Sequence, residues 1–226
     1  MKNILIVLTN TEKYGKLNKP TGLWLSELTH FYDVIVKNGM KADFVSPNGG
    51  YVPLDPKSLQ QMDETDWKWY ENEEFRNKAL GSTYKPQDID PGQYVAIYYA
   101  GGHGVMWDFC ESQSLAKIAG KIYKNNGYVT AVCHGVVGLV NVKDEADGYL
   151  LKGKTITGFT NEEENMNGTN KEVPFLAEDA LKERGAIFKA GAAFTEVVRV
   201  NGRLITGQNP QSAHSVGEEL VKKLEN

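Results

Sequence analysis

Residues 128–138 read Tyr-Val-Thr-Ala-Val-Cys-His-Gly-Val-Val-Gly, and an apolar run typical of a buried strand stops abruptly there at Cys133. A cysteine on a sharp strand-to-helix turn presents its sulfur at the end of the sheet. It also lies near the positive N-terminus of the next helix, which favours the thiolate. The order strand, Cys133, His134, Gly135 is that of a nucleophile elbow. The alternative is a cysteine that acts as a small hydrophobic residue. We expect Cys133 to be a nucleophile.

Short apolar runs alternate with helical patterns on both sides of this stretch, which is typical of parallel strands joined by crossover helices. Strands are predicted at 4–8, 42–46, 95–99, 128–132 and 155–158. Helices are predicted at 23–38, 112–125 and from Pro210 onward, with a short helix after Cys133 and Gly39 as the terminator of the first. Strands at 197–200 and 204–206 flank Asn201-Gly202, a dipeptide favoured in type I′ hairpins. The predicted fold is α/β, a flavodoxin-like three-layer sandwich with a mostly parallel central sheet.

The segment from Gly50 to Pro91 departs from this rhythm, because it is rich in charges, prolines and aromatic residues. We interpret residues 1–226 as a single domain in which 50–91 form an insertion or cap over one end of the sheet. A short helix is expected around 66–80. The aromatic residues favour a pocket cover or a subunit interface about as strongly as a solvated flap.

Composition excludes several classes of partner. The formal net charge is −4 and the two signs are mixed along the chain, so nucleic acid is disfavoured as a primary ligand. No apolar run approaches a membrane span, and the run from Ile4 to Leu8 is typical of a buried strand rather than a leader peptide. Two cysteines make no disulfide framework, which favours a cytoplasmic protein.

Gly101-Gly102-His103-Gly104 follows a predicted strand, at the sheet edge where open α/β folds bind ligands. Backbone N–H groups there favour an oxyanion- or substrate-binding loop. A tight turn that needs glycine is the simpler alternative, and the glycine spacing of phosphate-binding loops is absent.

The glycine loop and the elbow together resemble the ThiJ/PfpI superfamily, which is also named for the protein DJ-one. The similarity extends to its heat-inducible chaperone and glutathione-independent glyoxalase III branch. Further matching stretches are 20–27, 42–50, 107–109, 157–160 with Glu164, and 207–213. The resemblance runs from end to end of the chain.

This resemblance implies roles for individual residues. Cys133 matches the family nucleophile and His134 the imidazole beside it. Glu164, in Phe-Thr-x-x-x-Glu, matches the acidic partner of the imidazole, although the neighbouring Glu162 and Glu163 leave that choice open. Glu27 matches a glutamate that lies against the sulfur, where an apolar pocket would keep it partly protonated.

The remaining titratable residues are weaker candidates. His103 can contribute its ring, though its backbone amide is favoured, and we expect His30 and His214 to be structural. Cys110 is expected to be a core or interface thiol. No metal-ligand spacing is present in the sequence, so we expect neither a metal nor a cofactor.

The implied activity is a cofactor-independent glyoxalase III, which converts methylglyoxal and similar small 2-oxoaldehydes to D-lactate or other 2-hydroxy acids through a Cys133 hemithioacetal. A homodimer is expected by the same resemblance. The alternatives are a protein deglycase that uses the same residues, a holding chaperone for unfolded clients or a redox sensor, and a cysteine peptidase or amidase. The last is weakened because no His-x-Glu pair follows the nucleophile.

Overall fold

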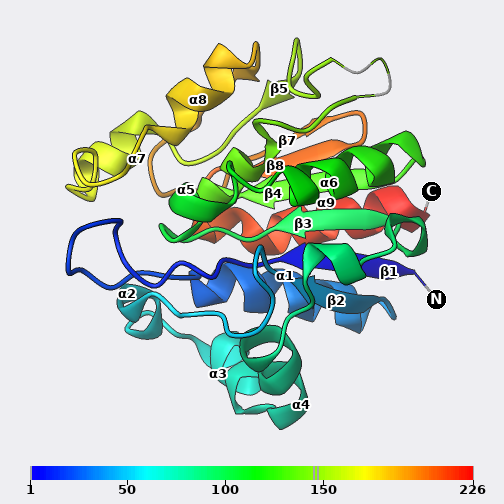
Figure 1. Ribbon diagram of the computed structural model, residues 1–226, viewed down its shortest axis with the longest axis horizontal. Helices are drawn as coiled ribbons and strands as arrows, with labels where there is room; N and C mark the ends of the chain where they lie inside the picture. Colours follow the sequence, from blue (N-terminus) through cyan, green and yellow to red (C-terminus); the bar gives the residue numbers. More distant parts are fainter. Residues whose placement is uncertain (1, 145, 147, 226) are drawn as a thin grey trace.

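A six-stranded sheet forms the centre of the computed structural model, which describes residues 2–144, 146 and 148–225 (Figure 1). Its strand order is β2-β1-β3-β4-β8-β7, and every neighbouring pair is parallel except the β7–β8 hairpin. The strands are β1 (Asn3–Val7), β2 (Lys41–Val45), β3 (Ala96–Tyr99), β4 (Tyr128–Val132), β7 (Val198–Asn201) and β8 (Leu204–Gly207). The predicted mostly parallel α/β sheet is therefore confirmed.

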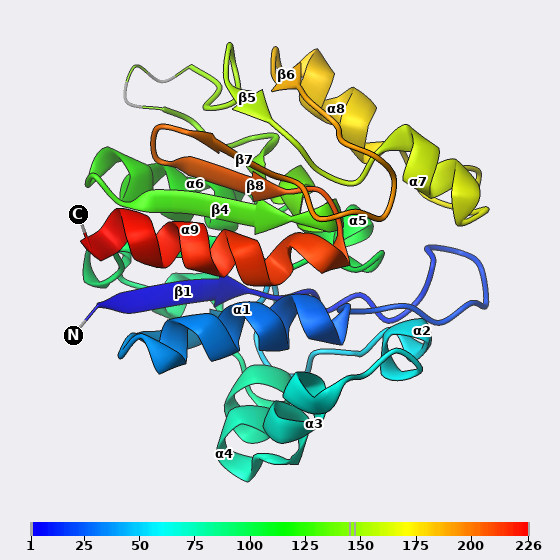
Figure 2. The same cartoon turned by 180° about the vertical axis from the view of Figure 1, so that it is seen from behind.

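Both faces of this sheet are covered, which explains why its central strands β1, β3 and β4 are almost continuously apolar. Helices α1 (Leu25–Lys37) and α9 (Ala213–Glu225) cover one face, as Figure 2 shows. The other face is covered by α5 (Val105–Asp108) and α6 (Gln113–Lys124). Successive side chains of a strand enter opposite layers. Tyr98 of β3 packs under α1, and its neighbour Tyr99 packs on the α6 side.

Several element boundaries agree with the predictions. The predicted strand at 128–132 is β4 without change, and α6 lies within the predicted helix, capped by the Ser112 hydroxyl. Helix α1 begins two residues after the predicted start. It ends before Gly39, whose φ of 70° is the left-handed conformation expected of a helix-terminating glycine.

The hairpin near the C-terminus forms, but its turn is not the predicted type I′. Asn201 pairs with Leu204, so the two turn residues are Gly202 and Arg203. Gly202 has a φ of 61°, whereas neither Asn201 nor Arg203 has positive φ, and type I′ needs positive φ at both central positions. The glycine therefore occupies the first turn position rather than the second.

The region between β4 and β7 contains elements that were mispredicted or missed. The predicted strand at 155–158 is shorter, β5 (Thr155–Ile156), and pairs with β6 (Ile187–Phe188) in a separate two-stranded sheet. Helices α7 (Asn161–Met166) and α8 (Ala177–Glu183) follow β5 and were not predicted. The short helix after Cys133 is a 3-10 helix, η4 (Cys133–Leu139).

The segment 50–91 contains helical pieces in place of the single helix predicted at 66–80. These are α2 (Pro56–Leu59), α3 (Glu64–Glu71), α4 (Glu73–Arg76), a π-helical turn η1 (Asn77–Gly81) and the 3-10 turns η2 (Pro86–Asp88) and η3 (Pro91–Gln93). The prediction was wrong because Asn72 is extended, with ψ at 112°, and its side chain caps α4 instead of continuing α3.

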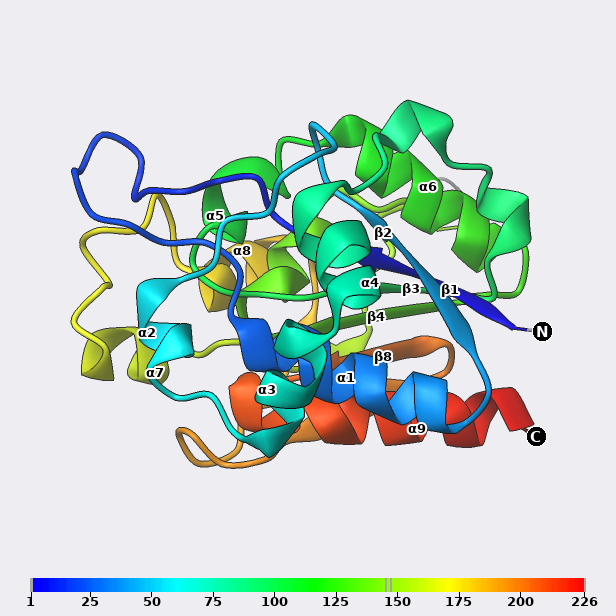
Figure 3. The same ribbon diagram turned by 90° about the horizontal axis from the view of Figure 1, so that it is seen from below.

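Hydrogen bonds hold the segment 50–91 against α1. Seen from below, α3 and α4 lie over α1 and the β2 edge (Figure 3). Ser58 Oγ accepts a hydrogen bond from the N–H of Leu25 at 3.0 Å, and the Thr29 hydroxyl donates to Asp66. Trp24, the N-cap residue of α1, provides no side-chain cap. The start of α1 is therefore held by the segment that follows β2.

No helix among the described residues is long and apolar enough to span a lipid bilayer.

Candidate active site

Cys133 occupies a strained turn between β4 and η4. Its φ is 56°, in the left-handed region that costs a non-glycine residue about 1–3 kcal/mol. Gly135 makes the turn possible, because a Cβ there would lie 2.3 Å from the carbonyl oxygen of Tyr99. Only 3% of Cys133 is exposed. The structure therefore contains the elbow that the sequence predicted.

His134 lies between the sulfur and a carboxylate. Its Nδ1 is 3.4 Å from Cys133 Sγ, and its Nε2 is 2.6 Å from Glu164 Oε2. Burial alone would raise the pKa of Glu164, but the charges and hydrogen bonds of His134 and His103 together hold that pKa well below its usual range. An ionised carboxylate only accepts hydrogen bonds, so His134 carries its proton on Nε2. Its Nδ1 then faces the sulfur.

The three consecutive glutamates of α7 have different environments, which the sequence did not distinguish. Glu162 is exposed, whereas Glu163 and Glu164 are buried. Glu163 accepts hydrogen bonds from the N–H groups of Thr160 and Phe194 and from the Asn209 amide, at 2.8–3.0 Å. Only Glu164 contacts His134.

Glu27 approaches the sulfur from α1 and is completely buried. Its Oε2 accepts a 2.7 Å hydrogen bond from the N–H of Gly101. Its Oε1 is buried and makes no hydrogen bond with the described residues, and the carboxyl lies beside the Cys133 thiol. Burial raises the pKa of Glu27 to about 8, so the carboxyl is mostly protonated at neutral pH.

The expectation of a thiolate at rest was wrong. Burial raises the pKa of Cys133 well above its usual value, and the ionised form of Glu27 raises it further. The N–H of His134 acts in the opposite direction but does not outweigh the burial. The helix-terminus argument failed because the sulfur is enclosed. Cys133 therefore rests as a thiol, with His134 Nδ1 placed to accept its proton.

The glycine loop is only partly available for binding oxygen. The N–H of Gly101 is used by Glu27, which removes it from the predicted oxyanion-binding set. Gly102 lines the pocket with a φ of 99°, and its N–H makes no hydrogen bond within the described chain. An added Cβ there would lie 2.4 Å from the carbonyl oxygen of Gly22, so glycine is required.

The ring of His103 contacts the catalytic group, and the expected role of its backbone amide stays a prediction. Its Nε2 is 2.8 Å from Glu164 Oε1, and its ring centroid is 4.2 Å from that of His134. The Thr169 hydroxyl donates to the same Oε1, and the Tyr14 ring lies 5.3 Å from His103. Sequence reasoning missed Thr169 and Tyr14, since neither lies in a motif that points to chemistry.

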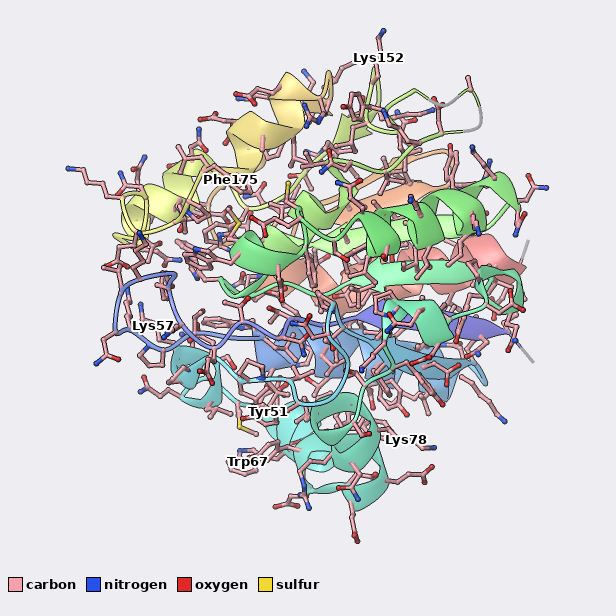
Figure 4. The ribbon with its side chains drawn as sticks, viewed as in Figure 1. Tyr51, Lys57, Trp67, Lys78, Lys152 and Phe175 are labelled. Carbon is pink, nitrogen blue, oxygen red and sulfur yellow. The ribbon has the colours of Figure 1, made fainter. Side chains whose placement is uncertain are left out.

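A pocket of about 380 Å³ opens onto the sulfur. Cys133, His134, His103 and Phe159 are among its lining residues. Polar side chains of other segments also line it, namely Asp55, Lys57, Gln61, Asn167 and Gln211. Lys57, at α2, lies at the same end of the sheet as α7, as Figure 4 shows. Part of the 50–91 segment thus lines the pocket.

Two groups of described residues bring metal-ligand atoms within 4.8 Å of one another. In the first, His103, His134 and Glu164, both Nε2 atoms already donate to the carboxylate, and a metal would have to replace these hydrogen bonds. In the second, His30 Nε2 lies 3.0 Å from Asp63 beside Asp66. We assign no metal to either group.

The remaining candidates lie outside the pocket lining. Cys110 is half-buried and packs against the core near Asn141. His214 is exposed on α9 and faces Glu218 at 3.3 Å.

A cysteine at the strand-to-helix elbow of a doubly wound sheet, with an imidazole and a carboxylate behind it, defines the class of α/β proteins with a nucleophilic cysteine. The sequence profile of the DJ-1/PfpI family matches residues 21–223, and the chain belongs to this family.

Three relatives show how far the similarity extends. The glutathione-independent glyoxalase HSP31 of Saccharomyces cerevisiae is 33% identical, and the alignment covers 100% of this chain and 99% of that protein. The Rapid Encystment Protein 24 KDa of Francisella tularensis superposes with a TM-score of 0.96 at 39% identity, covering 100% of both chains. Glyoxalase III of Candida albicans superposes with a TM-score of 0.87 at 28% identity, covering 98% of this chain and 96% of the other.

Proposed function

We propose that this protein is a glutathione-independent glyoxalase, which converts methylglyoxal and similar 2-oxoaldehydes to D-lactate and other 2-hydroxy acids. The observation that carries this proposal is the arrangement around the pocket-lining Cys133, in which His134 contacts the sulfur on one side and Glu164 on the other, and Glu27 lies beside the thiol. Relatives that align over the full chain and are named glyoxalases support it.

The first step adds the thiol to the aldehyde carbon of the substrate. His134 Nδ1 accepts the thiol proton as the sulfur–carbon bond forms, and then returns it to the aldehyde oxygen. The product is a hemithioacetal on Cys133. Gly102 lines the pocket, and its N–H, which makes no hydrogen bond with the described residues, stabilises the negative charge that develops on the oxygen.

The second step moves a proton between neighbouring carbons. His134 removes the carbon-bound proton of the hemithioacetal, and an enediolate forms. The hydroxyl proton passes from the first oxygen to the second, and return of the carbon-bound proton to the adjacent carbon gives the thioester of a 2-hydroxy acid. Water then releases the acid and regenerates the thiol. Neutral Glu27 lies against the sulfur without placing a second negative charge there.

The experiment is steady-state conversion of methylglyoxal to D-lactate without glutathione, comparing wild type with Cys133→Ala and Glu27→Gln. We expect turnover to be lost in Cys133→Ala and strongly reduced in Glu27→Gln. Wild-type turnover by Cys133→Ala, or no turnover by wild-type protein with a reduced thiol, would overturn the proposal.

The alternatives receive different support. A redox sensor is disfavoured by the burial and raised pKa of the thiol, because susceptibility to oxidation follows thiolate character and exposure. A deglycase would use the same residues and is tested with glycated peptides in the same assay.

We propose that the protein is a cytoplasmic homodimer. Exposed Tyr51, Trp67 and Tyr84 (Figure 4 labels the first two) are candidates for the subunit contact or for a surface that holds unfolded clients.

A further inference from the structure

Two imidazoles share one carboxylate in this site. Glu164 Oε2 lies 2.6 Å from His134 Nε2, and Oε1 lies 2.8 Å from His103 Nε2. The Thr169 hydroxyl also donates to Oε1, which fixes the carboxylate from a third direction. Because the ionised carboxylate only accepts, both rings donate through Nε2. A ring in its neutral form therefore keeps a free lone pair on Nδ1.

The two Nδ1 atoms face different surroundings. That of His134 lies 3.4 Å from Cys133 Sγ. That of His103 makes no hydrogen bond with any described residue, yet it is not among the fully buried polar atoms that lack a partner. Since His103 lines the pocket, this nitrogen is open to pocket water. Burial lowers the pKa of His103, and a proton on His134 lowers it further, so the neutral form of the His103 ring is favoured.

The reaction requires a base at this position. In the last step, water must lose a proton as it attacks the thioester, while the departing sulfur must gain one. The sulfur needs that proton because burial raises the pKa of the Cys133 thiol. His134 is placed at the sulfur, so a second base is needed for the water.

We propose that His103 is a second catalytic base, which activates the water that hydrolyses the Cys133 thioester. The inference rests on the proposed glyoxalase reaction. Nδ1 of His103 takes one proton of water as the new oxygen–carbon bond forms. The carbon–sulfur bond then breaks, and the proton of the new carboxyl passes through His134 to the sulfur. His103 releases its proton to solvent, so the step yields the 2-hydroxy acid anion, one proton and the free thiol.

The test is pre-steady-state kinetics of His103→Gln with methylglyoxal. The glutamine amide keeps an N–H donor for Glu164 but has no basic nitrogen. We expect a rapid burst of one substrate consumed per Cys133, followed by turnover slowed about 10²-fold, which is the usual contribution of a general base. Intact-mass measurement should show a lactoyl thioester on Cys133. Hydroxylamine, which needs less activation than water, should release lactohydroxamate and restore turnover.

Two control variants separate the base from a positioning role. His214→Gln changes an exposed imidazole far along the chain and should match wild type. Thr169→Val loosens Glu164 without removing a base, so it should lower burst and steady-state rates together. The same joint loss in His103→Gln would overturn the proposal, as would unchanged turnover in that variant.

A measurement on the wild-type protein tests the same role of His103 without depending on the folding of the His103→Gln variant. Hydrolysis of the acyl-enzyme should slow in heavy water, whereas hydroxylaminolysis should not. Equal sensitivity of both reactions would also overturn the role of His103. Failure of the proposed function is distinguishable, since wild type would then consume no methylglyoxal at all.

Discussion

The Tyr98 hydroxyl donates a 2.7 Å hydrogen bond to the main-chain carbonyl oxygen of Glu27, and the Tyr98 ring stacks on Phe31 with centroids 3.6 Å apart. This bond joins the centre of the sheet to the first turn of α1. Because the carboxyl of Glu27 reaches the sulfur from that same turn, the position of the acid depends on β3.

Tyr98→Phe tests this connection. Loss of the hydroxyl should lower the free energy of unfolding by about 1 kcal/mol and reduce kcat/KM, because Glu27 becomes less well placed. Tyr99→Phe is a matched control, since the Tyr99 hydroxyl donates at 3.2 Å to Leu115 on the opposite face. It should cost similar stability, measured by urea unfolding, and leave kcat/KM unchanged. Equal kinetics of the two variants would contradict the connection.

The three glutamates of α7 provide a second test. Glu164→Gln should lower kcat/KM by about 10³-fold or more, because His134 loses the acceptor that fixes its tautomer. Glu163→Gln should instead lower the free energy of unfolding by about 2 kcal/mol, through its hydrogen bonds to backbone and Asn209. Glu162→Gln should change neither. A catalytic defect confined to Glu163→Gln would show that Glu164 is the wrong partner.

The raised pKa of Glu27 predicts that the free energy of unfolding depends on pH. Its pKa is raised from 4.5 to about 8 on folding, so the folded state binds more protons than the unfolded state between these values. The stability contributed by the neutral carboxyl is complete below about pH 4.5 and is lost as pH rises through about 8. At about 1.4 kcal/mol per pH unit, the loss is at most about 5 kcal/mol.

The measurement is urea unfolding of wild type and Glu27→Gln across this pH range. The stability difference between the two proteins should grow in favour of the glutamine variant as the pH rises from 5 toward 8. Parallel curves would mean that Glu27 is not the group with the raised pKa.

Gly101→Ala should damage both fold and site. A Cβ at this position would lie 2.6 Å from Glu27 Oε2 and 2.9 Å from the backbone nitrogen of Gly135. The crowding should lower the free energy of unfolding by about 3 kcal/mol and displace Glu27. Gly81→Ala, whose nearest atom would be 3.7 Å away, is the control and should unfold as wild type does in a thermal melt. An active, stable Gly101→Ala protein would exclude this packing.

Local patterns were enough to predict the main sheet and the elbow. The β4 run and the Cys133-His134-Gly135 sequence have short-range signatures, and the structure places both as expected. The resemblance to a known family also identified Glu27 and Glu164, which the structure brings to Cys133 and His134. The spacing of Glu27 and Glu164 from Cys133 in the sequence did not by itself indicate a role for either residue.

The predictions that were wrong concerned features that depend on contacts between segments far apart in the sequence. The resting state of Cys133 is decided by burial, not by the helix that follows it. The Gly101 N–H is not available to substrate because it donates a hydrogen bond to Glu27, a residue 74 positions away in the sequence. Helix α3 ends before Asn72 because the Asn72 side chain caps the next helix, α4. The spacing of apolar residues does not indicate such a cap.

The capping of α1 by Ser58 has a consequence for attempts to build a smaller enzyme on this scaffold. Residues 50–91 look dispensable, since they interrupt the doubly wound pattern, and replacing them with a tight turn is an obvious simplification. Such a truncation would remove the acceptor for the Leu25 N–H, and the helix that presents Glu27 would begin with its donors exposed to water. A minimal version must therefore include a new capping residue in place of Trp24, so that the acid keeps its register with the sulfur.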